Sequence, residues 1–595
     1  MFLRTHHRRK YGKDHYYFSV VENRRVGGGG GGTTVQRQVL YLGEINTTQE
    51  AAWRKTLEVF DEHRARPTSL MLFPESQEVP ADALNAVRVK LDQMQLCRPR
   101  AYGNCWLGCW LWEQLELDRF WRSRLADERG AVPWAKVLQI LVVSRLIDPG
   151  SEWRLHRHGF EHGAFDELLQ VDFAAAAKDR LYRCLDLLLA HKNDLFTHLH
   201  HKWKDLFHAS YDVLLYDLTS TYFEGLCEGI PKAKHGYSRD GRPDCRQVVI
   251  ALVLTPDGFP LAYEVMPGNT SDKTTLRAFL AKIEETYGKA RRTWVMDRGI
   301  PTEETLGEMR QEGVDYLVGT PKGKLAAIHK KLLAQPWALV RQGVEVKLSD
   351  EAGELLVLAK SRGRQDKEIA IRRKKLKRLF NGLIALRRSC PERDRLLQRI
   401  GVLKHEAGRA AGMVDIHLPA AREAVTKETF HYRLRVDKFK QAEALDGHYL
   451  LRTSLRGEAP EVLWRYYVQL TEIEAAFKTL KSDLALRPLY HQVEARVEAH
   501  IFVAFLAYGL TATLAQRLKV YAPGLTPRAV LDKLSGIQMI DVQLPTTDGR
   551  LLVMPRYTQP EPDQQMLLEH LHLELPPQPP PRIYAGQVPS ARFKP

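Results

Sequence analysis

The chain has 595 residues, 44% of them hydrophobic, and its 88 Lys and Arg against 72 Asp and Glu give a formal charge of +16. This length predicts about three to five folding units, and the apolar fraction excludes a chain that is disordered throughout. The basic balance favours a partner with phosphate or acidic groups, but it does not identify one.

The cysteines and the apolar runs indicate the cellular compartment of the protein. Seven scattered cysteines favour a reducing, intracellular environment over a disulfide framework. The longest apolar run, residues 501–515, is shorter than the 20 or so residues that span a bilayer, and the N-terminus lacks the apolar region of a signal peptide. We therefore expect a cytoplasmic protein without a membrane span.

Residues 1–115 are predicted to form a β-rich region. Two β-rich runs flank six consecutive glycines, residues 27–32, which indicates a hairpin with a flexible tip. Thr33 leads into another strand, so the glycines do not form a phosphate-binding loop. Cys105 and Cys109 have no second Cys or His pair at zinc-ligand spacing and are expected to be small buried residues.

Residues 116–208 are predicted to form an all-α domain, because apolar residues recur at spacings of three and four. Such a domain could bind DNA or serve only for packing.

Residues 209–322 show an informative order of elements, strand, strand, strand, helix, strand, helix, strand. The ranges are 213–219, 246–254, 259–266, 272–288, 292–297, 302–313 and 315–320. Three antiparallel strands followed by parallel strands with crossover helices give a mixed sheet covered by helices. The fold class is therefore α/β, with the order of a ribonuclease H-like core that lacks only its last helices.

The missing helices are predicted within residues 456–525, at 469–486 and 493–518. The basic segment 323–455 interrupts the core as a mixed helical and β insertion. Residues 526–595 are expected to form a C-terminal segment with a Pro-rich tail.

Most of the positive charge lies in this insertion. Residues 360–409 hold 17 basic and 5 acidic residues, and Leu376, Leu379 and Leu383 fall on one face of an amphipathic helix. Such a concentration of charge favours phosphate contact; the alternative is a solvated helical face or a dimer contact. The predicted DNA-binding residues are Arg372, Arg373, Lys374 and Lys375.

Three acidic residues are candidate metal ligands. Asp217 lies in an apolar strand that should be buried, where a carboxylate is costly unless a cation compensates it. Asp297 ends the fourth strand, which neighbours the first, and Glu474 on a late helix could point at both. Three oxygen ligands suit magnesium or manganese. Taken singly, an Asp at a strand end more often caps a turn.

Three segments carry a family resemblance. They read YDLTSTYFEG, VMDRGIP and YYVQLTEIEAAFKTLKSDLALRPLYH. They resemble the acidic blocks of DDE transposases of bacterial insertion sequences, in the branch with a Tyr-Arg-Glu-Lys signature and a long insertion before the glutamate. Tyr467, Glu474 and Lys481 match that signature in spacing, while Leu470 stands in the place of the Arg.

The resemblance implies a metal-binding catalytic triad of Asp217, Asp297 and Glu474, holding two Mg²⁺ or Mn²⁺ ions. It also implies that Tyr467 and Lys481 contact the DNA end. Lys481 lies seven residues, about two turns, after Glu474 and is expected on the same helical face. The implied partners are double-stranded DNA, as terminal inverted repeats and target DNA, and a second copy of the chain on paired ends.

The implied reaction is cleavage at the element's ends, followed by joining of the 3′-hydroxyl to target DNA by two-metal phosphoryl transfer. Tyr216 and Tyr222 leave a covalent tyrosine mechanism formally open. Two other functions remain, a ribonuclease H-like nuclease or resolvase that cuts without joining, and a catalytically decayed DNA-binding relative. The complete set of three acids disfavours decay.

Overall fold

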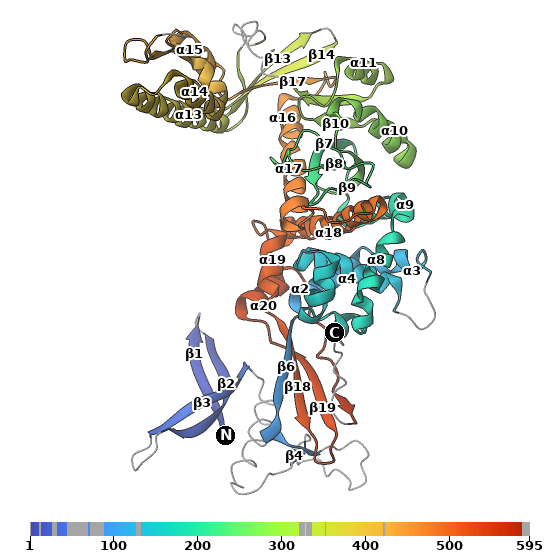
Figure 1. Ribbon diagram of the computed structural model, residues 1–595. Helices are drawn as coiled ribbons and strands as arrows, with labels where there is room; N and C mark the ends of the chain where they lie inside the picture. Colours follow the sequence, from blue (N-terminus) through green and yellow to red (C-terminus); the bar gives the residue numbers. More distant parts are fainter. Residues whose placement is uncertain are drawn as a thin grey trace. The chain divides into compact units, whose positions relative to one another are not determined.

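The computed structural model divides into two compact units (Figure 1). The first unit contains residues 1–199, 479–486 and 491–595, and the second contains residues 200–478 and 487–490. The structure describes residues 2–10, 13–26, 33–44, 70–71, 88–126, 132–288, 290–320, 328, 336–351, 353–420 and 423–585.

A nine-stranded sheet with the order β12-β13-β14-β17-β11-β10-β7-β8-β9 organises the second unit. Its first part follows the predicted element order, so that prediction is confirmed. The elements are β7 (Val213–Tyr222), β8 (Gln247–Leu254), β9 (Pro260–Pro267), α10 (Leu276–Tyr287), β10 (Thr293–Met296), α11 (Glu303–Glu312) and β11 (Asp315–Gly319). β7, β8 and β9 are antiparallel, whereas β10 runs parallel to both β7 and β11.

One face of this sheet packs against α10 and α11. Leu214, Tyr216 and Leu218 of β7 belong to one buried cluster with Phe279 of α10 and Met309 of α11. Because side chains alternate along a strand, Asp217 points to the opposite face from this cluster.

The strands at the ends of the insertion extend this sheet. β12 (Ala338–Arg341), β13 (Val344–Glu351), β14 (Glu354–Ser361) and β17 (His448–Thr453) continue it beyond β11, and β17 pairs antiparallel with both β11 and β14. The segment predicted as one insertion, 323–455, therefore consists of a sheet extension and a helical part.

The helical part of the insertion has a core of its own. It contains α13 (Arg362–Ser389), α14 (Arg393–Ala407), β15 (Val414–His417), β16 (His431–Leu434) and α15 (Val436–Ala444). Leu376, Leu379 and Leu383 of α13 pack on Leu396 and Ile400 of α14, so the predicted apolar face of the basic helix is confirmed.

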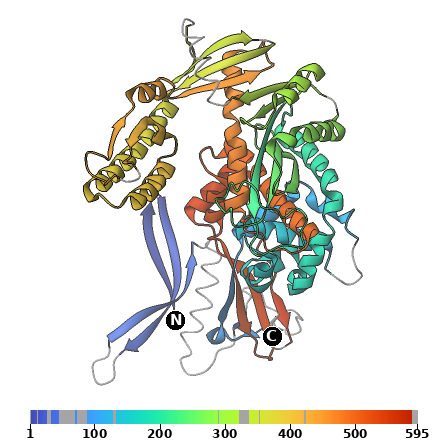
Figure 2. The same cartoon turned by 45° about the horizontal axis from the view of Figure 1, so that its top comes forward.

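Two consecutive helices complete the second unit. α16 (Pro460–Val468) packs against β11 and β12, and α17 (Leu470–Lys478) packs against β7. Both views show these helices running beside the strands of the sheet (Figures 1 and 2).

The first unit begins with a three-stranded antiparallel sheet, β1-β2-β3. Its strands are β1 (Phe2–Lys10), β2 (Lys13–Val26) and β3 (Thr33–Gly43). Val26 pairs with Thr33, which confirms the predicted hairpin. The glycine run 27–32 at its tip lies outside the described residues.

Helices make up most of the described residues between 103 and 207, so they begin within residues 1–115, the region predicted as β-rich. They include α2 (Gly103–Gln114), α3 (Leu117–Arg122), α4 (Trp134–Ile147), α5 (Glu152–Arg154), α6 (Phe160–His162), α7 (Phe165–Leu169), α8 (Lys178–Asp186) and α9 (Lys192–Phe207), whose end belongs to the second unit. Cys105 and Cys109 on α2 are buried, as predicted. None of the seven cysteines, all of which are among the described residues, forms a disulfide.

The long apolar helix α18 (Glu494–Tyr521) packs against α2, α4 and α8 of the first unit. The predicted second half of the core, 456–525, is thus divided between the two units. Of the described helices, α18 alone is long and apolar enough to cross a membrane, and 89% of its most apolar window is buried within the protein. This burial is that of a core helix.

The C-terminal segment pairs with the N-terminal region in a four-stranded sheet, β20-β19-β18-β6. Its strands are β6 (Gln95–Ala101), β18 (Gln538–Pro545), β19 (Leu551–Tyr557) and β20 (Arg582–Tyr584), and α19 (Pro527–Leu534) and α20 (Pro562–His570) flank them in sequence. The Pro-rich segment therefore ends in a paired strand.

Candidate active site

Two aspartates come together at neighbouring parallel strands of the second unit. Tyr216 of β7 pairs with Met296 of β10, so the next residue of each chain segment, Asp217 and Asp297, lies at the same level of the sheet. Asp217 is still within β7, whereas Asp297 follows the last residue of β10 and is exposed. The structure thus brings these two residues together, as their sequence context predicts.

The surroundings of Asp217 destabilise the charged form of its carboxyl group. Burial raises its pKa to about 7, and repulsion from Asp297 adds to this rise. The backbone N–H of Leu218 donates a 2.8 Å hydrogen bond to Asp217 Oδ1, and Arg239 lies nearby; both lower the pKa without cancelling the rise. A cation bound between the two carboxylates would offset this destabilisation.

Gly319, the last residue of β11, lets the chain pass close to Asp297. A Cβ atom at this position would lie 3.3 Å from the backbone N of Arg298 and 3.5 Å from Asp297 Oδ1. A larger side chain would therefore displace the segment that holds the carboxylate.

An ion pair beside Asp217 was not foreseen from the sequence. Arg239 Nη2 lies 2.6 and 2.8 Å from the two carboxylate oxygens of Asp272, and the Arg239 backbone N–H donates to Ser220 Oγ at 3.2 Å. Both charges act on Asp217, Arg239 lowering and Asp272 raising its pKa. Arg239 belongs to the irregular segment between β7 and β8, where no periodicity indicates its position.

Tyr467 on α16 lies near the aspartates. Burial raises its pKa to about 12, and the next largest contribution comes from the charge of Asp297. Its ring contacts those of Tyr449 and Trp464, with centroids 5.7 and 5.9 Å away. Tyr467 therefore forms part of an aromatic cluster beside the acidic pair.

Glu474 is exposed on α17. Gln469, between α16 and α17, has helical backbone angles (φ −63°, ψ −15°), so Tyr467 and Glu474, seven residues apart, fall on nearly the same helical face. Among the described residues, no hydrogen bond or ion pair joins Glu474 to Asp217 or Asp297. Its role as the third ligand stays a prediction.

Lys481 does not keep the predicted helical phase. It lies in a π-helical turn (Thr479–Asp483) that follows α17, and this wider turn breaks the two-turn α-helical spacing from Glu474. Lys481 also belongs to the first unit, whereas the acidic residues belong to the second. Lys481 is therefore shifted from the α-helical phase of Glu474, and its contact with the DNA end stays a prediction.

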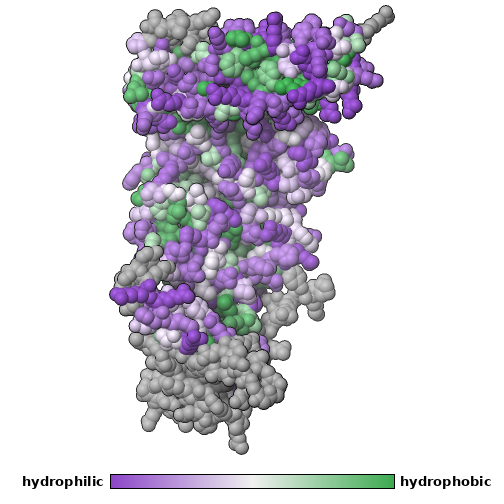
Figure 3. Space-filling model, turned by 90° about the vertical axis from the view of Figure 1, so that its left-hand side faces the viewer, coloured by the Kyte–Doolittle hydropathy of each residue, from purple (hydrophilic) through white to green (hydrophobic). Residues whose placement is uncertain are grey.

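Arg372 corrects the predicted DNA-binding set. Its side chain is 8% exposed and forms a bidentate ion pair with Asp446, with nitrogen–oxygen distances of 2.6 and 2.5 Å. The guanidinium is therefore committed to the protein interior. Arg373, Lys374 and Lys375 are exposed on α13. In the side view of Figure 3, the upper part of the protein shows many hydrophilic side chains around a hydrophobic patch.

The tyrosine-nucleophile alternative is not supported at Tyr216. This side chain is fully buried, its hydroxyl donates a 2.7 Å hydrogen bond to Thr275 Oγ1, and burial raises its pKa far above the ordinary range. Tyr222 lies at the end of β7, with the guanidinium of Arg242 5.0 Å from its ring centroid.

Comparisons with known proteins were made for the whole chain. A family model described as a transposase DDE domain matches residues 208–510, just over half of the chain. A cryo-EM structure of a piggyBac transposase synaptic complex with hairpin DNA is similar at 10% sequence identity and a TM-score of 0.35, with 74% of this chain and 82% of that chain covered. No curated protein matches.

Proposed function

Because the chain belongs to the transposase DDE domain family, which implies DNA transposase activity, we propose that it cuts DNA at the ends of an insertion sequence and joins the 3′-hydroxyl to target DNA. The observation that carries this proposal is the pairing of Asp217 with Asp297 on adjacent parallel strands. Both residues fall within the matched family domain.

The acidic pair suits a divalent metal ion. Carboxylate oxygens are the ligands that Mg²⁺ and Mn²⁺ prefer, and the pKa of Asp217 is raised first by burial and then by repulsion from Asp297, both of which a bound cation would offset. We propose that Asp217 and Asp297, with Glu474 as third ligand, hold two such ions. When bound, these ions supply positive charge at the reacting phosphate and promote deprotonation of the attacking water.

Other residues of the chain position the DNA. Tyr467, half-buried beside Asp297, offers an aromatic face and a hydroxyl to a terminal nucleotide. Arg373, Lys374 and Lys375 offer charges to the phosphate backbone without reading its sequence. Lys481 is retained only as a family-based candidate for contact with the DNA end.

The decisive experiment compares cleavage and strand transfer by Asp217→Asn, Asp297→Asn and Glu474→Gln. Each substitution removes a ligand charge with little change in volume, so each should abolish both steps while binding to DNA ends changes by only a few-fold. Glu472→Gln, on the same helix, is the matched control and should retain activity. Joining at the wild-type level by any one of the three variants would remove that residue from the site.

The assay also separates the rival functions. A ribonuclease H-like nuclease would yield cut ends without joined products, and a decayed relative would bind ends without cutting them. Joined products that disappear in Asp217→Asn exclude both.

We further propose that a homodimer acts on paired DNA ends, in the cytoplasm and associated with the nucleoid. Both ends of an element must be processed together, and seven cysteines that form no disulfide are consistent with a reducing compartment. Sizing of the joining-competent complex tests the assembly, and one chain on one DNA end would contradict it.

A further inference from the structure

A second group of metal-ligand side chains lies in the first unit. Glu152 is the first residue of α5, His491 precedes α18, and His500 lies in the second turn of α18. Their ligand atoms all lie within 4.8 Å of one another. Glu152 is 348 residues from His500 in the sequence, so the fold brings it to the two histidines.

The geometry of this group is close to that of a metal site. Nδ1 of His500 lies 2.8 Å from Glu152 Oε1, Nε2 of His491 lies 3.2 Å from Glu152 Oε2, and the two ring nitrogens are 3.2 Å apart. Ligand atoms bound tetrahedrally at zinc's bond lengths of about 2.0 to 2.1 Å stand roughly 3.3 Å apart. A zinc ion would therefore require only a slight expansion of the group.

The same atoms can hold either hydrogens or a cation. If both ring nitrogens carry hydrogens, each histidine donates to one oxygen of Glu152. Arg145 then donates to the carbonyl oxygens of Leu484 and Ala485. If the two nitrogens are unprotonated, they and the carboxylate present three lone pairs to one point, where a cation can bind.

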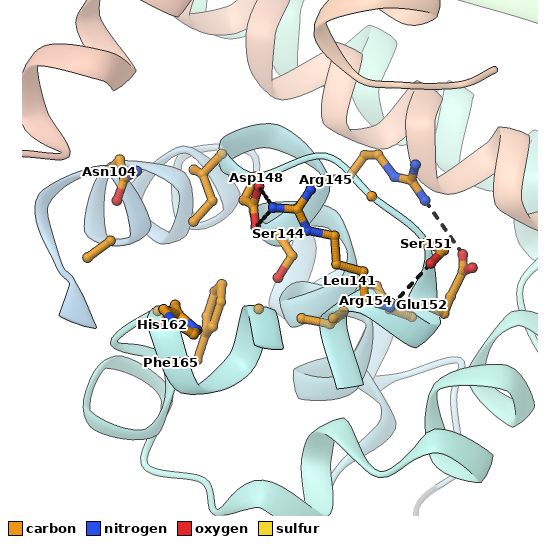
Figure 4. A pocket seen from close by; sticks show the side chains of 16 residues that line it. Asn104, Leu141, Ser144, Arg145, Asp148, Ser151, Glu152, Arg154, His162 and Phe165 are labelled. Atoms are coloured by element: carbon orange, nitrogen blue, oxygen red, sulfur yellow. Dashed lines mark hydrogen bonds and ion pairs between the residues drawn. The ribbon is translucent and has the colours of Figure 1, made fainter. Parts of the chain in front are cut away.

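The group is buried, and water could reach it from an adjoining cavity. Glu152 is 3% and His500 5% exposed. Glu152 and Arg145 also line a cavity of about 230 Å³, together with Ser144, whose buried hydroxyl has no hydrogen-bond partner in the structure (Figure 4). The lining is mostly apolar, but Ser144, Arg145 and Glu152 contribute polar groups, and the volume is large enough for water, which could take the fourth position of a tetrahedral ion.

We propose that Glu152, His491 and His500 bind a divalent transition-metal ion of the zinc class. Two imidazoles and one carboxylate favour zinc over magnesium, because magnesium prefers oxygen ligands only. The guanidinium of Arg145, 3.6 Å from Glu152 Oε1, repels any cation, so the two imidazole nitrogens must bind the ion strongly enough to outweigh this repulsion. The ion would tie α5 to the start of α18, and this proposal does not depend on the transposase reaction.

The test measures zinc in the full-length protein after chelation, reloading with zinc alone and removal of free metal. We expect one zinc ion per chain in the wild type and in Asp217→Asn, which alters the acidic pair instead. His491→Gln should lower zinc affinity by at least about 100-fold, beyond the 10- to 100-fold that outer partners of metal ligands contribute. His162→Gln, an exposed residue of the same cavity, is the matched control and should keep its zinc.

Two results would overturn the proposal. One is that the wild-type protein retains no zinc, and the other is that folded His491→Gln retains as much zinc as the wild type. Circular dichroism establishes whether the variant is folded. Should it fail to fold, cobalt bound to the wild type provides a direct test, because a tetrahedral nitrogen- and oxygen-ligated cobalt ion absorbs strongly in the visible range. The absence of that absorption would likewise refute the site.

Discussion

Because burial and Asp297 destabilise the charged form of Asp217, we expect that removing this charge stabilises the metal-free protein. The folded-state pKa of about 7 lies above the ordinary value of 3.8, so folding favours the protonated carboxyl. The protonated Asp217 carboxyl makes its full contribution to the free energy of unfolding below about pH 4, and this contribution is lost as the pH rises to about 7. At about pH 8 the carboxyl is ionised in both the folded and the unfolded chain. The difference between the two pKa values, at about 1.36 kcal/mol per pH unit, then lowers the free energy of unfolding by roughly 4 kcal/mol.

Asp217→Asn removes this cost while keeping the shape of the side chain. The second unit has roughly 280 residues, and unfolding entropy of about 2.1 cal/mol/K per residue converts 4 kcal/mol to a rise of about 7 °C in its melting temperature. The measurement is scanning calorimetry of the chelated full-length chain at about pH 8. The exposed carboxylate variant Asp205→Asn is the control, expected to change stability by no more than about 0.5 kcal/mol.

Added magnesium gives the second half of this test. An ion that binds only the folded site stabilises it by mass action, so the wild type should melt at a higher temperature with magnesium and Asp217→Asn should respond much less. The reasoning is refuted if the chelated wild type and Asp217→Asn melt at the same temperature at about pH 8. Equal magnesium responses would separately refute the metal assignment of Asp217.

Two further predictions concern the basic helix α13. Arg372→Met should destabilise the second unit by about 3 to 5 kcal/mol in denaturant unfolding, because it leaves the Asp446 carboxylate buried without its partner, whereas Arg372→Met with Asp446→Leu should recover most of this loss. The triple replacement of Arg373, Lys374 and Lys375 by Ala should weaken specific and random duplexes alike and flatten the salt dependence of binding by a log-log slope of roughly 0.9 per lost phosphate contact; an unchanged slope would contradict DNA contact by these residues.

The sequence predicts the part of the fold that depends on local pattern. The strands and helices from β7 to β11 follow from apolar runs, turns and caps, and their pairing follows from the rules for crossover connections. Asp217 and Asp297 meet because their strands are neighbours. The order of the elements in the sequence is thus enough to predict that these two residues lie side by side.

The sequence does not predict what depends on tertiary partners. The strand pattern of β17 gives no sign that it would pair with β11 as well as β14, and the apolar pattern of α18 fits packing in either unit. The position of Arg372, by contrast, carried a usable signal. It lies four residues before Leu376, on the apolar face of α13, which indicates a buried partner rather than DNA.

The chain enters and leaves the helical part of the insertion at one place in the sheet. Lys360 of β14 pairs with His448 of β17, so residues 361–447 leave and rejoin one antiparallel ladder at the same residue pair. At this neck Gly447 has φ +75°, and a Cβ there would lie 2.6 Å from the carbonyl oxygen of Ser361. Topologically, the helical part is an elaborated hairpin tip. Evolution could enlarge, exchange or delete such a module, and a protein engineer could replace it with a short turn, without changing the order of the strands that carry the two aspartates.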